Sequence, residues 1–135
     1  MVQLSLKQGL EAEIPLALER AIAPLRDEAV LIVGSGLSYH YLRQFFSPRG
    51  WGPSRAFDAW LNGVPLGDNP RDPDKLLARR EAAPAARAVH PRDEHLLPLH
   101  VAVGAAGDDA AELTYHENDF LGGLTVSSHR FRTAA

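Results

Sequence analysis

The sequence AVLIVGSG at residues 29–36 combines five consecutive apolar residues with a glycine-serine-glycine ending. An uninterrupted apolar run closed by glycines is typical of a strand that is covered on both faces. Before it, apolar residues from Ile14 to Leu25 recur at helical spacing, with Pro15 near the first turn. Residues 2–6 alternate between apolar and polar like a strand. A strand, a helix and a buried strand in this order predict a parallel α/β unit with a right-handed crossover.

The rest of the chain predicts helices that flank this sheet and two further strands. Residues 44–57, rich in aromatic residues, glycine and proline, predict an ordered loop that leads into a helix over residues 54–62. Helices are also expected over residues 72–80 and 92–103. Alternation at residues 111–115 and 124–128 predicts two strands joined through Gly122 and Gly123. We expect one domain over residues 1–135, an α/β fold with a mixed or mostly parallel sheet.

Composition narrows the function classes. The chain has 135 residues, enough for one domain with its own core. Its 14 basic and 17 acidic residues give a net charge of −3, which argues against binding to nucleic acid or to an anionic membrane surface. Cysteine is absent, so histidine and carboxylate are the strong metal ligands available. With no secretion signal or spanning segment in the sequence, we expect a cytoplasmic protein.

The glycines after the apolar run do not complete a familiar catalytic motif. Tyr39 stands where a dinucleotide-binding fingerprint requires its third glycine, and no lysine follows as in a P-loop. Ser35 is not the serine of a nucleophile elbow, because Val33 occupies the preceding glycine position. We expect Gly34 and Gly36 to allow a sharp turn at the carboxyl end of a strand, where α/β proteins place their sites.

Histidines are the remaining candidates for chemistry: His40, His90, His95, His100, His116 and His129. The string HPRDEH at residues 90–95 is rich in imidazole and carboxylate but lacks the HExxH spacing of zinc proteases. By residue type alone, His95 is either a metal ligand or a polar surface or capping group. His40 is either an acid/base group or a loop histidine bonded to backbone. His100 is expected to be structural, and His116 and His129 have no ligand-like neighbours in the sequence.

Five strings carry a family resemblance: VQLSL at 2–6, LRDEAVLIVGSG at 25–36, His40 with Leu42, PRDEHLLPL at 91–99 and VGAA at 103–106. In this order they resemble the C-terminal half of the LigB-type class III extradiol dioxygenases, with the DOPA extradiol dioxygenase branch nearest. The resemblance covers nearly the whole chain, and EHLLPL is its most specific block. The chain departs from the family at Tyr41, where asparagine is usual, and at Ser128 and His129, where an arginine-serine pair is commoner.

The resemblance implies an enzyme that opens a catecholic ring with O2 at a non-haem metal ion, Fe(II) or Zn(II). It implies a metal site with His95 and the adjacent Glu94. His40 is implied as the second histidine of the pocket, which either touches the metal or acts as the catalytic acid/base. The implied substrate contacts are Ser35, Gly36 and Tyr41.

The family's first half carries a His-Gly-Ser-Pro loop and a Ser-Ala-His-Trp strand end, and neither string occurs here. We therefore expect a truncated, split or partial chain that lacks two metal-ligand histidines. Three hypotheses follow. The chain is an enzyme completed by another polypeptide with the N-terminal half, a non-catalytic binding or assembly subunit with the same fold, or a fragment that folds only as a homo-oligomer.

Overall fold

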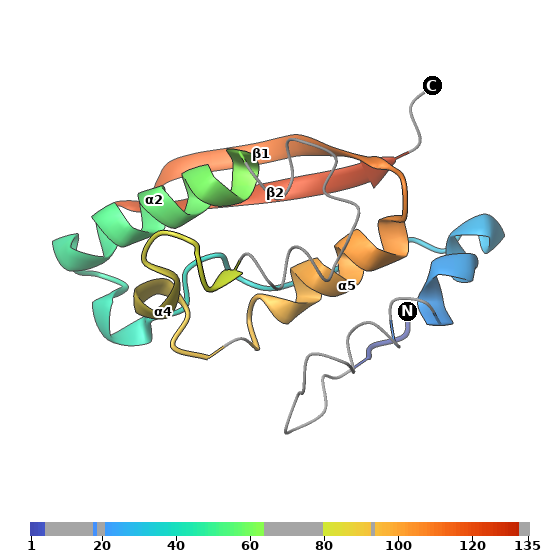
Figure 1. The fold of residues 1–135 in the computed structure, drawn as a ribbon, viewed down its shortest axis with the longest axis horizontal. Coiled ribbons are helices and arrows are strands. Elements are labelled where there is room, and N and C mark those ends of the chain that lie inside the picture. Colours follow the sequence, from blue (N-terminus) through green and yellow to red (C-terminus); the bar gives the residue numbers. More distant parts are fainter. Residues whose placement is uncertain (5–17, 19–20, 64–79, 93, 133–135) are drawn as a thin grey trace.

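The computed structural model describes residues 1–4, 18, 21–63, 80–92 and 94–132. Its elements are the 3-10 helices η1 (Ala23–Glu28) and η2 (Leu42–Gln44), the helices α2 (Pro48–Gly63), α4 (Ala86–Val89) and α5 (Leu97–Ala106), and the strands β1 (Ala110–Phe120) and β2 (Leu124–Arg132). The hairpin of β1 and β2 lies over α2 and α5, while α4 packs beside α2 (Figure 1). The described part of the chain is therefore a two-stranded layer on a layer of helices.

The strands β1 and β2 pair antiparallel in one continuous hairpin. Its turn has a positive φ at three consecutive residues, Leu121 (52°), Gly122 (84°) and Gly123 (137°), which favours the two glycines. Gly123 is also fixed by packing, because a Cβ atom there would lie 2.3 Å from the side chain of Trp51. The predicted strands joined through Gly122 and Gly123 are confirmed, and both are longer than predicted.

The helix α2 begins at Pro48, well before the predicted start at Ser54. Gly50 and Pro53 favour a loop in the sequence, but both lie inside the helix. Gly50 is buried, and a Cβ atom there would lie 2.7 Å from the hydroxyl oxygen of Tyr39. Glycine thus lets the first turn of α2 pack closely on Tyr39. The prediction of a loop is wrong for residues 48–53, because tertiary packing outweighs local preference.

The main core lies where the hairpin, α2 and α5 meet. Its buried members are Tyr39, Phe57, Leu61, Ala83, Val89, Leu96, Val103 and Leu124. A smaller cluster joins Ile22 to Val101 and Ala105 of α5. Burial of each large apolar side chain contributes about 1.5 to 3 kcal/mol to folding. The two clusters fix α5 between the hairpin and η1.

Two polar joints supplement these apolar contacts. The Ser54 hydroxyl of α2 donates to the Thr125 carbonyl at 3.1 Å and accepts from the Thr125 N–H at 3.0 Å. At the other end of the molecule, the Arg26 guanidinium donates to the Ala106 carbonyl at 3.0 Å and forms an ion pair with Asp109. Arginine here satisfies the carboxyl end of α5, where a positive charge is favourable.

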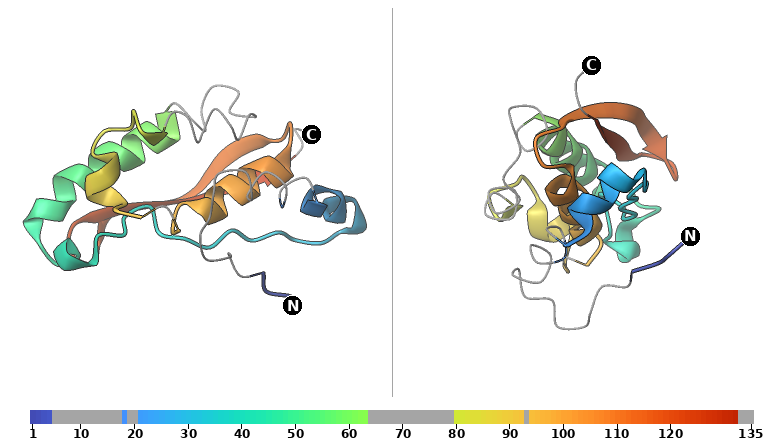
Figure 2. Two further views of the ribbon diagram at one scale, coloured as in Figure 1. Left: turned by 60° about the horizontal axis from the view of Figure 1, so that its bottom comes forward. Right: turned by 90° about the vertical axis from the view of Figure 1, so that its right-hand side faces the viewer.

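Residues 30–36 run extended alongside α5 (Figure 2, left) but pair with no described strand. The side chains of Val30, Leu31 and Val33 are 44%, 85% and 74% exposed, whereas Ile32 packs against the cluster of α5. The prediction of a strand covered on both faces is wrong for the described part of the chain. The run has the composition of a buried strand, but α5 covers only part of it and no described strand pairs with it. The described sheet is antiparallel, and a mostly parallel sheet is not found in it.

The other predicted elements have mixed outcomes. Residues 2–4 form no strand, and residues 5–6 lie outside the described residues. The predicted helix over 14–25 falls mostly outside them too, and η1 follows it over Ala23–Glu28 with Pro24 in its first turn. The helix predicted over 92–103 is found as α5, shifted to Leu97–Ala106. The helix predicted over 72–80 lies outside the described residues except for Arg80. No described helix has both the length and the apolar content to cross a membrane.

Candidate functional site

A groove of about 760 Å³ lies between the extended segment and β2, with α5 beside it. Its apolar wall includes Ile32, Leu96 and Leu99, which suit contact with a flat apolar group. Its polar lining comes from both sides. On the segment and the start of α5 the polar residues are Ser35, Ser38 and His95, and on β2 they are Ser127, Ser128, His129 and Arg130.

Close contact with α5 explains the two glycines that end the apolar run. A Cβ atom on Gly34 would lie 2.3 Å from the Pro98 carbonyl oxygen, and one on Gly36 would lie 2.1 Å from the His95 carbonyl oxygen. The backbone forms no turn at residues 34–36, so the predicted sharp turn is wrong. The glycines instead allow the backbone of the segment to reach the start of α5. This contact places Ser35 and Gly36 in the groove wall beside His95.

The rings of His40 and His95 stack face to face, with centroids 3.2 Å apart and an angle of 22° between their planes. His40 is held from two further sides. Its backbone N–H donates to the Val89 carbonyl at 2.9 Å, and Phe45 meets its ring edge-on at 6.4 Å. Burial lowers the pKa of His40 and the neighbouring His95 lowers it further, while Glu94 acts in the opposite direction. The structure thus brings together two histidines that lie far apart in the sequence.

Glu94 lies on the exposed side of this pair. Its Oε1 atom is 3.7 Å from Nε2 of His95, and its side chain is about half exposed. Within the described ranges, no group of three or more histidine or acidic side chains is arranged to hold a metal ion. His95, Glu94 and His40 lie close together, but they do not form such a group.

The remaining residues named from the sequence take different places. Tyr41 is half-buried and packs against the main core, and it does not line the groove. His90 is buried, with its Nε2 atom 3.1 Å from the Leu37 carbonyl oxygen. His100 is buried too, and its Nδ1 atom lies 3.0 Å from the Leu96 carbonyl oxygen. The HPRDEH string is therefore divided between the core, which receives His90, and the groove.

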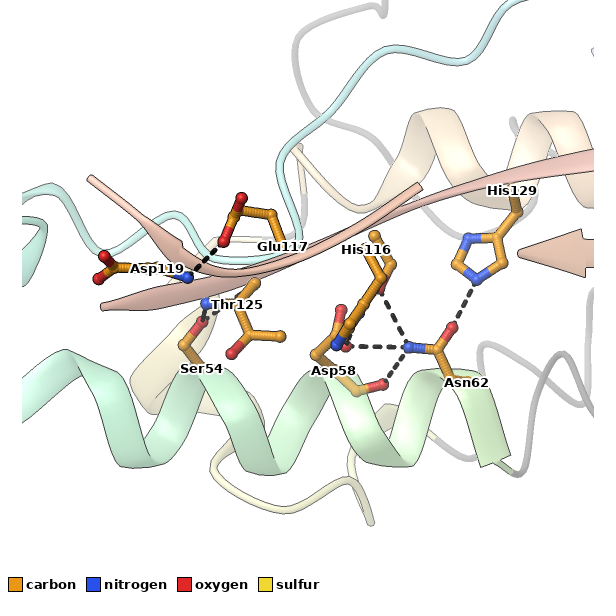
Figure 3. Close-up of polar contacts among 9 residues, drawn as sticks. Ser54, Asp58, Asn62, His116, Glu117, Asp119, Thr125 and His129 are labelled. Carbon is orange, nitrogen blue, oxygen red and sulfur yellow. Dashed lines mark hydrogen bonds and ion pairs between the residues drawn. The ribbon is translucent and has the colours of Figure 1, made fainter. Parts of the chain in front are cut away.

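A second polar cluster, not expected from the sequence, lies between α2 and the hairpin (Figure 3). Asp58 is 2% exposed, and its Oδ2 atom accepts a hydrogen bond from Asn62 at 2.9 Å. His116 of β1 approaches the same Oδ2 atom at 3.5 Å, and His129 of β2 lies 2.6 Å from Oδ1 of Asn62. The available signal was the spacing of Asp58 and Asn62, which places both polar side chains on one face of the predicted helix.

Comparison with known proteins gives a consistent set of relatives. No family model matches the sequence. The 4,5-DOPA dioxygenase extradiol of Portulaca grandiflora is 37% identical over 134 residues, and that of Beta vulgaris is 33% identical over 137 residues. Each alignment covers 96% of this chain and 48% of the relative. A dioxygenase of Hapsidospora irregularis is 29% identical over 133 residues, with 90% of this chain and 41% of that protein covered.

A solved structure has a similar fold. The crystal structure of an uncharacterized protein from Escherichia coli K12 superimposes with a TM-score of 0.63 at 23% sequence identity. The match covers 89% of this chain and 50% of that one. In both kinds of comparison, the chain spans about half the length of the proteins that it matches.

Proposed function

Because this chain corresponds to one half of a LigB-type extradiol dioxygenase, we propose that it forms part of the active site of a ring-opening dioxygenase. The enzyme would cleave a catechol-type substrate with O2 at a non-haem metal ion, Fe(II) or Zn(II). The observation that carries the proposal is the stacked pair of His40 and His95, of which His95 lines the groove. Histidine is a common ligand of such metals and the usual acid/base group at neutral pH.

In this proposal His95 is a metal ligand, with Glu94 beside it as a further ligand or as the group that orients it. The described residues do not by themselves fit a metal ion, since they bring together fewer donors than such a site needs. In this proposal the missing ligands belong to the half of the relatives that this chain does not match. When bound, the metal would hold the catechol and polarise it for reaction.

His40 is proposed as the acid/base group. It lies against His95 and Phe45, which restrict the ring to one orientation. A fixed imidazole beside a bound catechol is suited to accept a proton from a hydroxyl group and to return it later. Ser35 and Gly36 would contact the substrate from the groove wall. Tyr41, the residue after His40, packs against the main core and does not line the groove, so it is proposed to support His40 from the core side instead of contacting the substrate as predicted.

Reconstitution tests this proposal. The chain is combined without oxygen with the unmatched half of the Portulaca grandiflora relative, then given ferrous ion, DOPA and O2. We expect a yellow ring-opened product, measured by its absorbance. His95→Ala should abolish both metal retention and turnover. His40→Ala should retain the metal and slow turnover by about two to four powers of ten, the usual contribution of a placed acid/base group.

The control is Tyr115→Phe, which removes a polar group from an exposed side chain of β1 outside the groove and should leave metal content and turnover unchanged. Loss of the metal in His40→Ala would show that His40 is a ligand and would overturn its assigned role. If the combined halves retain metal but form no ring-opened product, the chain is a binding or assembly subunit with the fold of the enzyme.

A further inference from the structure

The cluster of Asp58, Asn62 and His129 fixes the orientation of one side chain after another. The Nδ2 atom of Asn62 lies 2.9 Å from both the backbone oxygen and Oδ2 of Asp58. Carbonyl and carboxylate oxygens only accept hydrogen bonds, so the amide must direct its NH2 group toward Asp58. The opposite end of the amide, Oδ1, is then directed at His129. The buried carboxylate of Asp58 thereby decides which way Asn62 faces (Figure 3).

The same reasoning fixes the tautomer of His129. Its Nε2 atom is 2.6 Å from Oδ1 of Asn62, and an amide oxygen only accepts. Nε2 therefore carries the hydrogen atom, and in the neutral ring Nδ1 carries a lone pair. Burial lowers the pKa of His129, against a smaller opposing effect of Asp58, which favours this neutral form. Nδ1 is thus a hydrogen-bond acceptor.

His129 also belongs to the wall of the groove. Together with Ser127 on the same strand, it lines the side opposite His95. No hydrogen bond joins its Nδ1 atom to another described residue, whereas Nε2 is engaged by Asn62. Because the residue lines the groove, its ring is within reach of a ligand bound there. The apolar Leu61 and Phe131 also line the groove and suit the faces of an aromatic ring.

We infer that His129 is a substrate-positioning residue, whose Nδ1 atom accepts a hydrogen bond from a hydroxyl group of a catechol or a related phenol in the groove. Asp58 and Asn62 are positioning residues that act through His129. This inference rests on the proposed function for the class of ligand, but it assigns a residue on the β2 side of the groove, across from His95. Because Nδ1 is a neutral acceptor, it favours a ligand whose hydroxyl group donates a hydrogen bond. An anionic oxygen in the same place would face the lone pair of Nδ1 and is disfavoured.

Two measurements on the full chain test the inference, and neither requires turnover. Long-range proton–nitrogen correlation spectra of the imidazoles report the tautomer. We expect His129 to carry its proton on Nε2, and Asn62→Leu to give a mixture of both forms. A proton on Nδ1 of His129 in the unaltered chain would overturn the inference.

The second measurement is the Kd of 4-nitrocatechol, followed by chemical shifts of groove residues. His129→Phe, which keeps a ring but removes the acceptor, should raise this Kd about three- to tenfold, the value of one net hydrogen bond. Tyr115→Phe, which also keeps a ring and removes one polar group, is the matched control and should leave this Kd unchanged, because Tyr115 is exposed on β1 and does not line the groove. An unchanged Kd in His129→Phe, or no binding of 4-nitrocatechol in the groove, would contradict the inference.

These results separate the inference from the proposed function. If the reconstituted halves make no product but His129→Phe weakens 4-nitrocatechol binding, the positioning role stands and the proposed function is wrong. If product forms and His129→Phe binds 4-nitrocatechol as tightly as the unaltered chain, the proposed function stands and the role of His129 is wrong.

Discussion

Gly36 lies so close to the start of α5 that it has no room for a side chain. A Cβ atom there would lie 2.1 Å from the His95 carbonyl oxygen, which belongs to backbone and has little freedom to move. Gly52 of α2 is the opposite case, since a Cβ atom there meets nothing within 4 Å. The same residue type is thus required at one position for packing and carries only an entropic cost at the other.

Alanine substitutions at these two glycines should have opposite effects on stability. Gly36→Ala forces the segment away from α5, and we expect it to lower the free energy of unfolding by about 1 to 3 kcal/mol. Gly52→Ala adds a methyl group to an open helix position and should raise this free energy by about 0.5 to 1 kcal/mol. Urea denaturation followed by circular dichroism measures both. A stable Gly36→Ala variant would contradict the close packing described here.

At the scale of elements, α2 is fastened to the hairpin through side chains. Ser54 serves both backbone groups of Thr125, the second residue of β2, with bonds of 3.1 and 3.0 Å. Ser54 is 1% exposed and Thr125 is 2% exposed, so water cannot replace these bonds. The Ser54 hydroxyl therefore satisfies both backbone groups of Thr125, as a neighbouring strand would in a larger sheet.

Removal of this hydroxyl should weaken the joint between α2 and β2. Ser54→Ala leaves the N–H and carbonyl of Thr125 buried without these bonds, and we expect a loss of about 1 to 3 kcal/mol in the free energy of unfolding. Ser128→Ala is the matched control, because Ser128 is exposed on the same strand. It should change stability by less than about 0.5 kcal/mol. Thermal denaturation measures both variants. Equal stabilities would show that the Ser54 hydrogen bonds do not stabilise the contact between α2 and β2.

Elements encoded by local sequence signals could be predicted, whereas those that depend on tertiary contacts could not. The hairpin was predictable because alternation and the pair Gly122 and Gly123 are local signals. The start of α2 was not predictable, because Gly50 is required there by its close packing against Tyr39, which is distant in the sequence pattern. For the candidate site, Ser35, Gly36 and His95 could be placed in one site from the family resemblance. The cluster around Asp58 depends on the docking of the hairpin on α2, which no local pattern encodes.

At the scale of the whole molecule, the extended segment leaves apolar surface uncovered. Leu31 and Val33 are mostly exposed, and residues 31–36 make no backbone hydrogen bond to another described segment. An apolar strand with free backbone groups is a template for pairing with another chain. The groove beside it adds to this surface.

We therefore expect the isolated chain to self-associate at micromolar concentration unless a partner covers this edge. Leu31→Lys should reduce the association, because it places a charge on the edge without touching the core. Leu113→Lys is the control, since Leu113 is 49% exposed on β1, outside the segment and the groove. Sedimentation velocity measures the species present. An unaltered chain that remains monomeric throughout would contradict this expectation.

The contrast between the paired hairpin and the bare segment has a consequence for hydrogen exchange. Amides in the ladder of β1 and β2 are held by partner carbonyls and should exchange slowly. Amides of residues 31–36 have no such partner in the described structure and should take up deuterium almost as fast as an unfolded peptide. A strand that docks beside them would slow this uptake. Deuterium uptake at these six consecutive residues therefore reports whether another strand is bound at this edge.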